Sequence, residues 1–372
     1  MMLQAVAKWT AIVIALAFLA AFLAVFVAYW MSDNTCDSDV AQQGELMSAV
    51  IYCDYGPPDV LRIEQISKPV PDDNQLLVKV RAAAVNPLDW HYMRGTPYFM
   101  RLDAGLRKPE STRLGVDYSG TVEAVGKNVT QFKSGDEVFG GRNGALAEYI
   151  TVLADRAVVR KPANLTFEQA AAVPIAAITA LQGLRDEGDV QPGQKVLING
   201  ASGGVGTFAV QIAKSFGADV TGVCSTRNLE LVRSIGADKV IDYTRQNYTE
   251  GAERYDVILD MVGNHSLSAN RRVLEPEGKY VLVGGGGPDE GNWIGAISGP
   301  IKAMLVSPFV SQELGMMLAQ LNKEDLNVLA KLMSAGTVTP VIDRRYPLRE
   351  TADAIRYLET GRARGKVIIV ID

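Results

Sequence analysis

The sequence predicts an α/β protein: a small, irregular β-barrel and a doubly wound parallel sheet, preceded by one apolar helix. Three observations predict it. From Met47 onward, short apolar or alternating runs are separated by turn residues, which is typical of antiparallel strands. After Gly193, apolar strands alternate with helices, as in the βαβ units of a parallel sheet. Residues 9–30 are apolar at 21 of their 22 positions, with Thr10 the exception.

The apolar run at the N-terminus is long enough to cross a membrane. As a helix it measures about 33 Å, against a bilayer core of about 30 Å. Trp9, Tyr29 and Trp30 stand at its two ends, where aromatic belts form. We expect a single-pass transmembrane helix over residues 9–30 and a polar linker over residues 31–46. A cleaved signal peptide and a buried core helix are the alternatives; a signal peptide would have a shorter apolar stretch.

Composition excludes several classes of protein. The chain has 372 residues, 21% of them charged, and a net charge of −5. This length corresponds to about two domains, and this charge predicts neither a disordered chain nor a nucleic-acid partner. The three cysteines are scattered and odd in number, and there are two histidines. Their spacing predicts no disulfide framework and no metal site.

The barrel elements come first along the chain. The predicted strands are Ser48–Tyr52, Leu76–Val80, Gly120–Gly126 and Asp136–Gly140. An alanine-rich helix is predicted over Phe167–Leu184, with Pro174 inside it.

The parallel sheet follows. Its predicted strands are Lys195–Asn199, Asp219–Cys224, Lys239–Asp242, Asp256–Asp260 and Lys279–Val283. The predicted helices between and after them are Thr207–Phe216, Asn228–Ile235 and Ala352–Glu359, and a last strand is predicted over Lys366–Ile371.

The loop after the first parallel strand carries a dinucleotide fingerprint. Ala201-x-Gly203-x-x-Gly206 is GxGxxG with alanine in first place, and it lies between a strand and a helix. Small residues there permit a tight turn, close approach of a pyrophosphate and helix–strand packing. The helix N-terminus supplies N–H groups for the phosphates. We expect these residues to bind the cofactor: Ser202, Gly203, Gly204 and Val205.

The end of the second parallel strand favours NADPH over NADH. NAD sites carry an Asp or Glu there for the ribose 2′-hydroxyl. Here the strand ends in Cys224-Ser-Thr-Arg-Asn228, without an acid. Ser225 and Thr226 can donate hydrogen bonds, and Arg227 can pair with a 2′-phosphate. The alternative is that Arg227 is a solvated residue at the start of the next helix.

Several motifs occur together between Met47 and Asp372: Val85-Asn-Pro-Leu-Asp89, Gly115-x-Asp117-x-x-Gly120, Gly135-Asp-Glu-Val138, Ala170-Ala-Ala-Val-Pro174 and Ala363-Arg-Gly-Lys366. In this combination the chain resembles the medium-chain dehydrogenase/reductase superfamily, in its zinc-free quinone oxidoreductase branch. The resemblance implies a GroES-like catalytic domain over 47–173, a Rossmann domain over 174–304 and a return to the catalytic domain over 305–372.

The resemblance also implies roles for particular residues. Zinc alcohol dehydrogenases carry metal ligands where this chain has Asn86-Pro87 and Gly115-Val116-Asp117, so it implies catalysis without zinc. Asn86 is expected near the nicotinamide ribose, Thr179 near the carboxamide and Tyr243 beside the 2′-phosphate. The remaining residues expected near the cofactor are Gly263, Gly284, Ala363, Arg364, Gly365 and Lys366.

His91 and Tyr92 are the candidate catalytic residues. Many family members place a tyrosine where this chain has His91, and either side chain can give a proton or a hydrogen bond to a substrate oxygen. For His91 a partly buried structural imidazole is an equal alternative.

These observations predict a membrane-anchored, NADPH-dependent reductase of a lipophilic quinone or α,β-unsaturated carbonyl. An NADPH-binding membrane scaffold without turnover and a zinc-free alcohol dehydrogenase are the alternatives, and a homodimer is possible in each case. Lys8 precedes the apolar run and only acids follow it closely, which by the positive-inside rule places the body outside the cytoplasm. The need for NADPH favours the opposite face, so the side of the membrane stays open.

Overall fold

The computed structural model describes residues 44–284 and 310–371, together with Cys36 and twelve separate positions between residues 9 and 30. Those twelve positions are helical and exposed. Within the described part of the chain, no helix is long and apolar enough to span a membrane. The other positions of the predicted membrane helix, and most of the predicted linker, lie outside the described residues.

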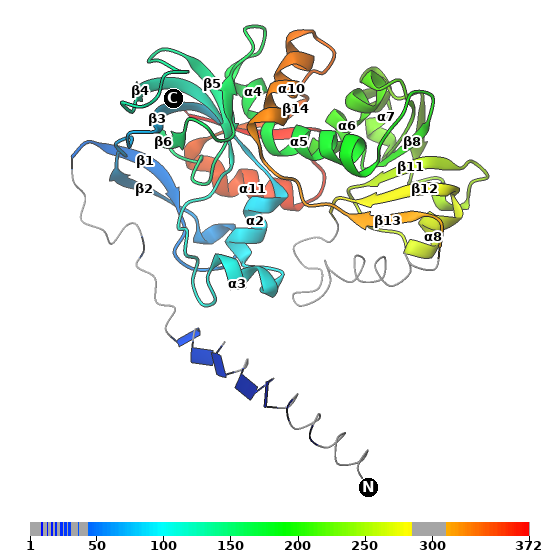
Figure 1. The fold of residues 1–372 in the computed structure, drawn as a ribbon, viewed down its shortest axis with the longest axis horizontal. Coiled ribbons are helices and arrows are strands. Elements are labelled where there is room, and N and C mark those ends of the chain that lie inside the picture. The colour runs from blue at the N-terminus through cyan, green and yellow to red at the C-terminus, as the bar shows by residue number, and fades with distance from the viewer. Residues whose placement is uncertain are drawn as a thin grey trace.

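The first unit is built on a seven-stranded sheet with the order β14-β15-β3-β4-β5-β7, in which β6 also pairs with β3 (Figure 1). All its pairings are antiparallel except that of β14 with β15. The strands are β3 (Gln75–Val85), β4 (Asp117–Val125), β5 (Glu137–Gly141), β6 (Tyr149–Leu153), β7 (Val158–Arg160), β14 (Ile342–Pro347) and β15 (Lys366–Val370). A hairpin of β1 (Leu46–Ile51) and β2 (Arg62–Ser67) lies beside this sheet.

The second unit is a six-stranded parallel sheet with the order β10-β9-β8-β11-β12-β13. In chain order this is 3-2-1-4-5-6, the doubly wound arrangement that the sequence predicts. The strands are β8 (Lys195–Asn199), β9 (Asp219–Cys224), β10 (Lys239–Asp242), β11 (Tyr255–Asp260), β12 (Leu274–Leu282) and β13 (Glu313–Met316). Val196 and Ile198 face one buried cluster and Leu197 faces another, so β8 is covered on both sides.

The helices connect and cover these sheets. They are α2 (Pro87–Arg94), α3 (Arg101–Ala104), α4 (Phe167–Ala171), α5 (Pro174–Gln182), α6 (Gly204–Ser215), α7 (Leu229–Ser234), α8 (Leu267–Arg272), α10 (Lys323–Ser334) and α11 (Thr351–Glu359). Helices α5, α6 and α10 contribute to the larger core of the second unit.

The single helix predicted over Phe167–Leu184 is wrong. The structure ends α4 at Ala171 and starts α5 at Pro174. Proline lacks an N–H and clashes with the preceding turn, but it fits the first position of a new helix. The predicted domain boundary at residue 174 therefore falls at a helix start, whereas the one at residue 304 lies outside the described residues.

One disulfide was not expected from the cysteine spacing. Cys36 is bonded to Cys53, 17 residues further on, with their Cα atoms 5.4 Å apart. Cys36 is 8% exposed and packs in a small cluster with β1 and β2 residues, among them Met47 and Ile66. Cys224 is free and buried, and burial raises the pKa of its thiol to about 11, as suits an inert core residue.

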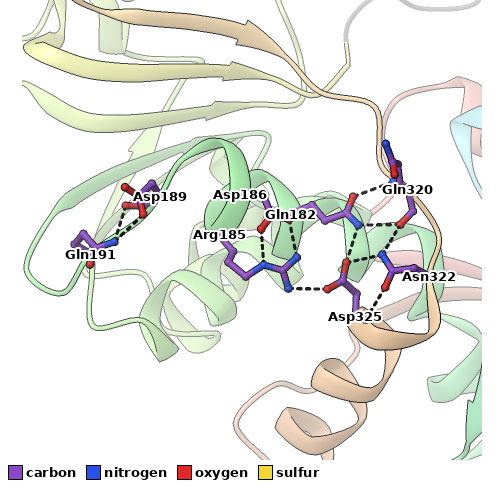
Figure 2. A network of polar contacts seen from close by, with 8 residues as sticks. All are labelled: Gln182, Arg185, Asp186, Asp189, Gln191, Gln320, Asn322 and Asp325. Atoms are coloured by element: carbon purple, nitrogen blue, oxygen red, sulfur yellow. Dashed lines mark hydrogen bonds and ion pairs between the residues drawn. The ribbon is translucent and has the colours of Figure 1, made fainter.

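A polar network fastens the returning C-terminal chain to α5 (Figure 2). The Gln182 amide donates to the Gln320 carbonyl and to Asp325, and accepts from the Gln320 N–H. Asp325 also accepts from Arg185, at 2.6 Å, and from Asn322, which caps α10. Burial favours a higher pKa for Asp325, but these hydrogen bonds outweigh it and hold the pKa below its usual range.

This network predicts a measurable loss of stability. Asp325→Asn should lower the free energy of unfolding by about 1–3 kcal/mol at pH 7, because hydrogen bonds to a charged group are lost. A depressed pKa stabilises the folded state above the unfolded-state pKa of about 4, and this stabilisation is lost as the pH falls through the folded value. Denaturation curves should therefore show a constant difference between pH 7 and 5 that shrinks only below about pH 4.

Asp186→Asn is the matched control. Asp186 is 46% exposed, and its one ion-pair partner among the described residues is Arg185. Its loss should cost less than about 1 kcal/mol. Equal losses for the two variants would contradict the role given to Asp325.

Candidate active site

The loop between β8 and α6 has the geometry of a phosphate cradle. Gly200 has a φ of +90°, and a Cβ on Gly206 would lie 2.1 Å from the Gly200 carbonyl oxygen. Gly203 caps α6 without a side-chain acceptor. The first-turn N–H groups of α6, which include those of Gly204 and Val205, are therefore available to an anion.

The chain before β15 returns to this loop, as the predicted role of residues 363–366 requires. The Gly365 N–H donates to the Ser202 carbonyl at 2.9 Å, and Gly365 pairs with Gly203 in an isolated parallel bridge. Gly365 has a φ of +99°, and a Cβ there would lie 2.4 Å from the Val341 carbonyl oxygen. The close approach of the two backbones therefore requires glycine at position 365.

Next to this link, Lys366 enters a buried polar cluster. Its ammonium lies 2.5 Å from Asn86 Oδ1 and 3.2 Å from Asp117 Oδ2. The Asn86 amide also donates to Asp117 Oδ2, at 3.0 Å. All three residues are at most 3% exposed. Burial raises the pKa of Asp117, and the Lys366 ammonium opposes the shift.

The cluster extends to α5. The Ile175 N–H donates to Asp117 Oδ1 at 2.9 Å, and the Thr179 hydroxyl donates to the Ile175 carbonyl at 2.7 Å. A chain of hydrogen bonds thus brings together Asn86, Lys366 and Thr179, which the sequence analysis named separately. Asp117 is the common acceptor of Asn86, Lys366 and the Ile175 N–H, a role that its place in Gly115-x-Asp117-x-x-Gly120 did not predict.

Residues at the end of β9 meet the end of β10. The Thr226 hydroxyl donates to Asp242 Oδ2 at 2.6 Å, and this bond helps to lower the pKa of Asp242. The Arg227 guanidinium donates to the Arg362 backbone carbonyl at 2.6 Å, and so joins the end of β9 to the chain that precedes β15. Tyr243 follows Asp242, its side chain is 58% exposed, and its N–H donates to the Cys224 carbonyl at the end of β9.

Asn228 is a site residue that the sequence analysis missed. Its amide donates to the hydroxyls of Ser202, at 2.9 Å, and Ser225, at 3.3 Å, and so joins the loop to the end of β9. Asn228 is 5% exposed, and within the described residues its Oδ1 atom has no hydrogen-bond partner. A helix-start asparagine gives little signal in a sequence, because it is also a common cap.

Gly263 and Gly284 follow neighbouring strands. The Gly263 N–H donates to Asp260 Oδ1 at 2.9 Å, and the Asn199 amide donates to the same oxygen at 2.8 Å. Gly284 follows β12, and a Cβ there would meet its nearest neighbour, the Met261 carbonyl, at 3.7 Å. Both glycines therefore lie at the carboxyl ends of β11 and β12, on the side of the sheet where ligands bind in this architecture.

The two candidate catalytic residues lie on α2. The His91 ring stacks on Trp90, with centroids 3.7 Å apart, and its Nδ1 lies 2.7 Å from the Thr96 carbonyl oxygen. A carbonyl only accepts, so Nδ1 carries the proton. Burial lowers the pKa of His91, which keeps the ring neutral and leaves Nε2 as an acceptor. Burial, followed by the charge of Asp103, raises the pKa of Tyr92 and keeps its phenol protonated.

Two family models match the chain: the alcohol dehydrogenase GroES-like domain over residues 72–163, and the zinc-binding dehydrogenase over residues 235–369. In the described ranges, no group of three or more His, Cys, Asp or Glu side chains is arranged to hold a metal ion.

Relatives extend this match over almost the whole chain. It is 38% identical to the 2-methylene-furan-3-one reductase of Solanum lycopersicum, over 87% of this chain and 79% of that protein. It is 35% identical to the chloroplastic NADPH-dependent alkenal/one oxidoreductase of Arabidopsis thaliana, over 90% and 81%. The structure of Escherichia coli quinone oxidoreductase complexed with NADPH matches with a TM-score of 0.75 and 26% identity, over 87% and 99%.

The GroES-like and Rossmann-like units and the length of these matches agree with the resemblance carried by the sequence motifs. The chain belongs to the medium-chain dehydrogenase/reductase superfamily, in its quinone oxidoreductase branch.

Proposed function

We propose that the chain is an NADPH-dependent reductase that passes a hydride to a quinone or to an α,β-unsaturated carbonyl, without zinc. The observation that carries the proposal is the Gly365–Ser202 hydrogen bond, which sets the phosphate loop directly beside the buried Lys366 cluster. The printed names of the relatives, which include an NADPH-dependent alkenal/one oxidoreductase and a quinone oxidoreductase, support it.

The residues present fit NADPH. The free N–H groups at the start of α6 suit a pyrophosphate, and the unpaired Asn228 Oδ1 can accept from a ribose hydroxyl. Arg227 and the Ser225 hydroxyl suit a 2′-phosphate, whereas the Thr226 hydroxyl already donates its proton to Asp242. When bound, NADPH supplies the hydride. Asn86 and Thr179, fixed through Asp117, would orient its nicotinamide end.

The proposal that zinc plays no part rests on how Asn86 and Asp117 are engaged. They lie in the two motifs that carry metal ligands in zinc alcohol dehydrogenases. Here both bind the Lys366 ammonium, which already places one positive charge at this point. Without a Lewis acid to polarise an alcohol oxygen, an acceptor that is already electron-poor is the better substrate.

Reduction of such an acceptor leaves an oxyanion that needs a proton. We assign the donor role to Tyr92, because it lies on α2, the helix that Asn86 caps, and burial, which raises the pKa of its phenol, keeps it protonated. Neutral His91, with Nδ1–H held by Thr96, can accept a hydrogen bond at Nε2 from water or a phenol. His91 would therefore orient the donor or relay its proton.

We further propose that residues 9–30 anchor the chain in a membrane, with the body on the side that contains NADPH. Large apolar side chains at described helical positions are exposed, for example Trp9 at 68% and Leu16 at 58%, and lipid would cover them. The need for NADPH decides the side of the membrane in this proposal. Two observations favour the opposite side: Lys8 precedes the apolar run, and the Cys36–Cys53 disulfide is of a kind that persists in oxidising compartments.

The reductase proposal predicts cofactor-specific turnover by the full chain in detergent, offered a short-chain quinone or a simple enone. NADPH should be oxidised and NADH far more slowly. Arg227→Ala should weaken NADPH binding about tenfold or more and leave NADH binding unchanged, because a hydrogen-bonded charge pair to the 2′-phosphate is lost.

Arg233→Ala is the control, since Arg233 pairs with the exposed Glu230 on α7. NADPH binding without turnover on either acceptor would favour a scaffold, and turnover of a plain alcohol with NADP would favour the zinc-free dehydrogenase. Equal losses for both cofactors in Arg227→Ala would reject the 2′-phosphate assignment.

The assigned proton donor predicts a rate effect. Tyr92→Phe should lower kcat about tenfold or more, the low end of general acid catalysis, with an unchanged KM for NADPH. His91→Phe should lower kcat to a similar extent if His91 relays the proton. An unchanged kcat in His91→Phe, with a lowered melting temperature, would return His91 to a structural role at the end of α2.

The proposed side of the membrane predicts reduced cysteines in the cell. Alkylation of intact cells, followed by mass spectrometry, should find Cys36 and Cys53 as free thiols, because NADPH-containing compartments are reducing. Cys224 is the control: it is buried and unpaired, so its alkylation after denaturation shows that the labelling of free thiols is complete. A bridged Cys36–Cys53 pair in fresh cells would place the body on the oxidising side.

A further inference from the structure

The segment from Thr96 to Lys108, called here the basic lobe, combines exposed apolar side chains with positive charge. Phe99 is 44% exposed and Leu102 is 69% exposed. The lobe holds three cations, Arg101, Arg107 and Lys108, against one acid, Asp103, in a chain whose net charge is −5. Apolar side chains among cations are the composition of segments that lie in the headgroup region of a bilayer.

The lobe is held rigidly to the barrel through Tyr55. The Tyr55 hydroxyl is within hydrogen-bond distance of the carbonyls of Ala104, at 2.9 Å, and Gly105, at 2.6 Å. The Arg101 guanidinium stacks on the Tyr55 ring at 4.4 Å and donates to the Gly95 carbonyl. The exposed apolar side chains therefore stand on a fixed support.

The same support leads back to the apolar N-terminal run. Tyr55 lies two residues after Cys53, and Cys53 packs in the same small cluster as Cys36. Cys36 lies six residues after Trp30, so extended chain spans at most about 20 Å between them. Cys36 packs against residues of β1 and β2 in this cluster, so the attachment does not need the Cys36–Cys53 disulfide. A membrane helix ending at Trp30 would thus hold this margin of the body close to the lipid surface.

The lobe also borders the candidate catalytic helix. The Thr96 N–H donates to the His91 carbonyl at 3.1 Å, and the His91 ring bonds to the Thr96 carbonyl. In Figure 1, α3 lies at the lower margin of the body, below which the described helical positions of residues 9–30 are drawn. A molecule that leaves the bilayer at the lobe would therefore meet α2 next.

We propose that the basic lobe rests on the anionic surface of the bilayer in which residues 9–30 are anchored, with Phe99 and Leu102 inserted among the headgroups, and that a lipophilic acceptor enters the site from there. This rests on the anchoring and the acceptor class proposed above. We take lipid as the occupant for two reasons. The short chain between Trp30 and Cys36 would keep this margin of the body near the membrane, and the cations of the lobe are complementary to anionic headgroups.

The test uses the full chain in vesicles of phosphatidylcholine and phosphatidylglycerol, with a diazirine-bearing phosphatidylglycerol as probe. Photolysis should label the tryptic peptides Gly95–Arg101 and Leu102–Arg107 as well as the apolar N-terminal run. The peptide that contains Leu318, which is 79% exposed on the other unit, should stay unlabelled. Labelling of residues 9–30 alone would reject the lipid contact of the basic lobe but support the membrane anchor. Labelling of neither segment would reject both proposals.

Kinetics supply the second readout. The double variant Phe99→Ser with Leu102→Ser should raise the KM for a long-chain prenylated quinone in the vesicles about fivefold or more, with the KM and kcat for a water-soluble quinone unchanged. Leu318→Ser is the matched control and should change neither. Equal effects on both quinones would overturn the lobe as an entry surface. If the wild type reduces neither quinone, the reductase proposal fails, while the lipid labelling still decides where the lobe lies.

Discussion

The position of one buried charge, the ammonium of Lys366, constrains much of this structure. It is 3% exposed, and its oxygen partners are Asn86 Oδ1 and Asp117 Oδ2. An uncompensated buried charge costs about 3–5 kcal/mol, so these partners cannot move away without a large penalty. Asn86 precedes α2 and Asp117 begins β4, and Asp117 also accepts the Ile175 N–H of α5. One cation therefore fixes the ends of two helices and two strands at a single point.

The residue before Lys366 transmits this constraint to the parallel sheet. Gly365 can donate to the Ser202 carbonyl only because it lacks a side chain, since Val341 leaves no room for a Cβ. Ser202 in turn accepts from Asn228, which reaches Ser225 at the end of β9. A continuous set of hydrogen bonds thus runs from the barrel to the predicted 2′-phosphate site. These hydrogen bonds would hold the binding residues for the two halves of a cofactor at a fixed separation, if the cofactor spans both units.

The sequence predicts what is local and fails where distant groups meet. The Gly200–Gly206 loop is found because its steric demands fall within seven consecutive residues, and the bounds of β8, β9 and β10 agree with the predicted strands because alternating helices punctuate them. The break between α4 and α5 at Pro174 is also a local effect, but the sequence analysis predicted one continuous helix there. Other contacts join elements that are far apart in the chain. They are the Cys36–Cys53 bond, the hydrogen bond from Thr226 to Asp242, and the hydrogen bonds that Asp117 accepts, one of them from Ile175. No spacing along the chain reports such contacts, because the fold alone brings them within reach.

The buried cluster also bears on the class of acceptor. Asn86 Oδ1 and Asp117 Oδ2 both bind the Lys366 ammonium, and Asp117 Oδ1 accepts the Ile175 N–H, so these oxygens are already engaged in the described structure. In the zinc-free reductase proposed above, the acceptor would bring its own activation, as a quinone or an enone does through conjugation. Conjugated acceptors with prenyl or alkyl tails partition into lipid, where their local concentration exceeds that in water. Under the proposed anchoring, the chemistry of the site and the apolar run at the start of the chain favour the same kind of substrate.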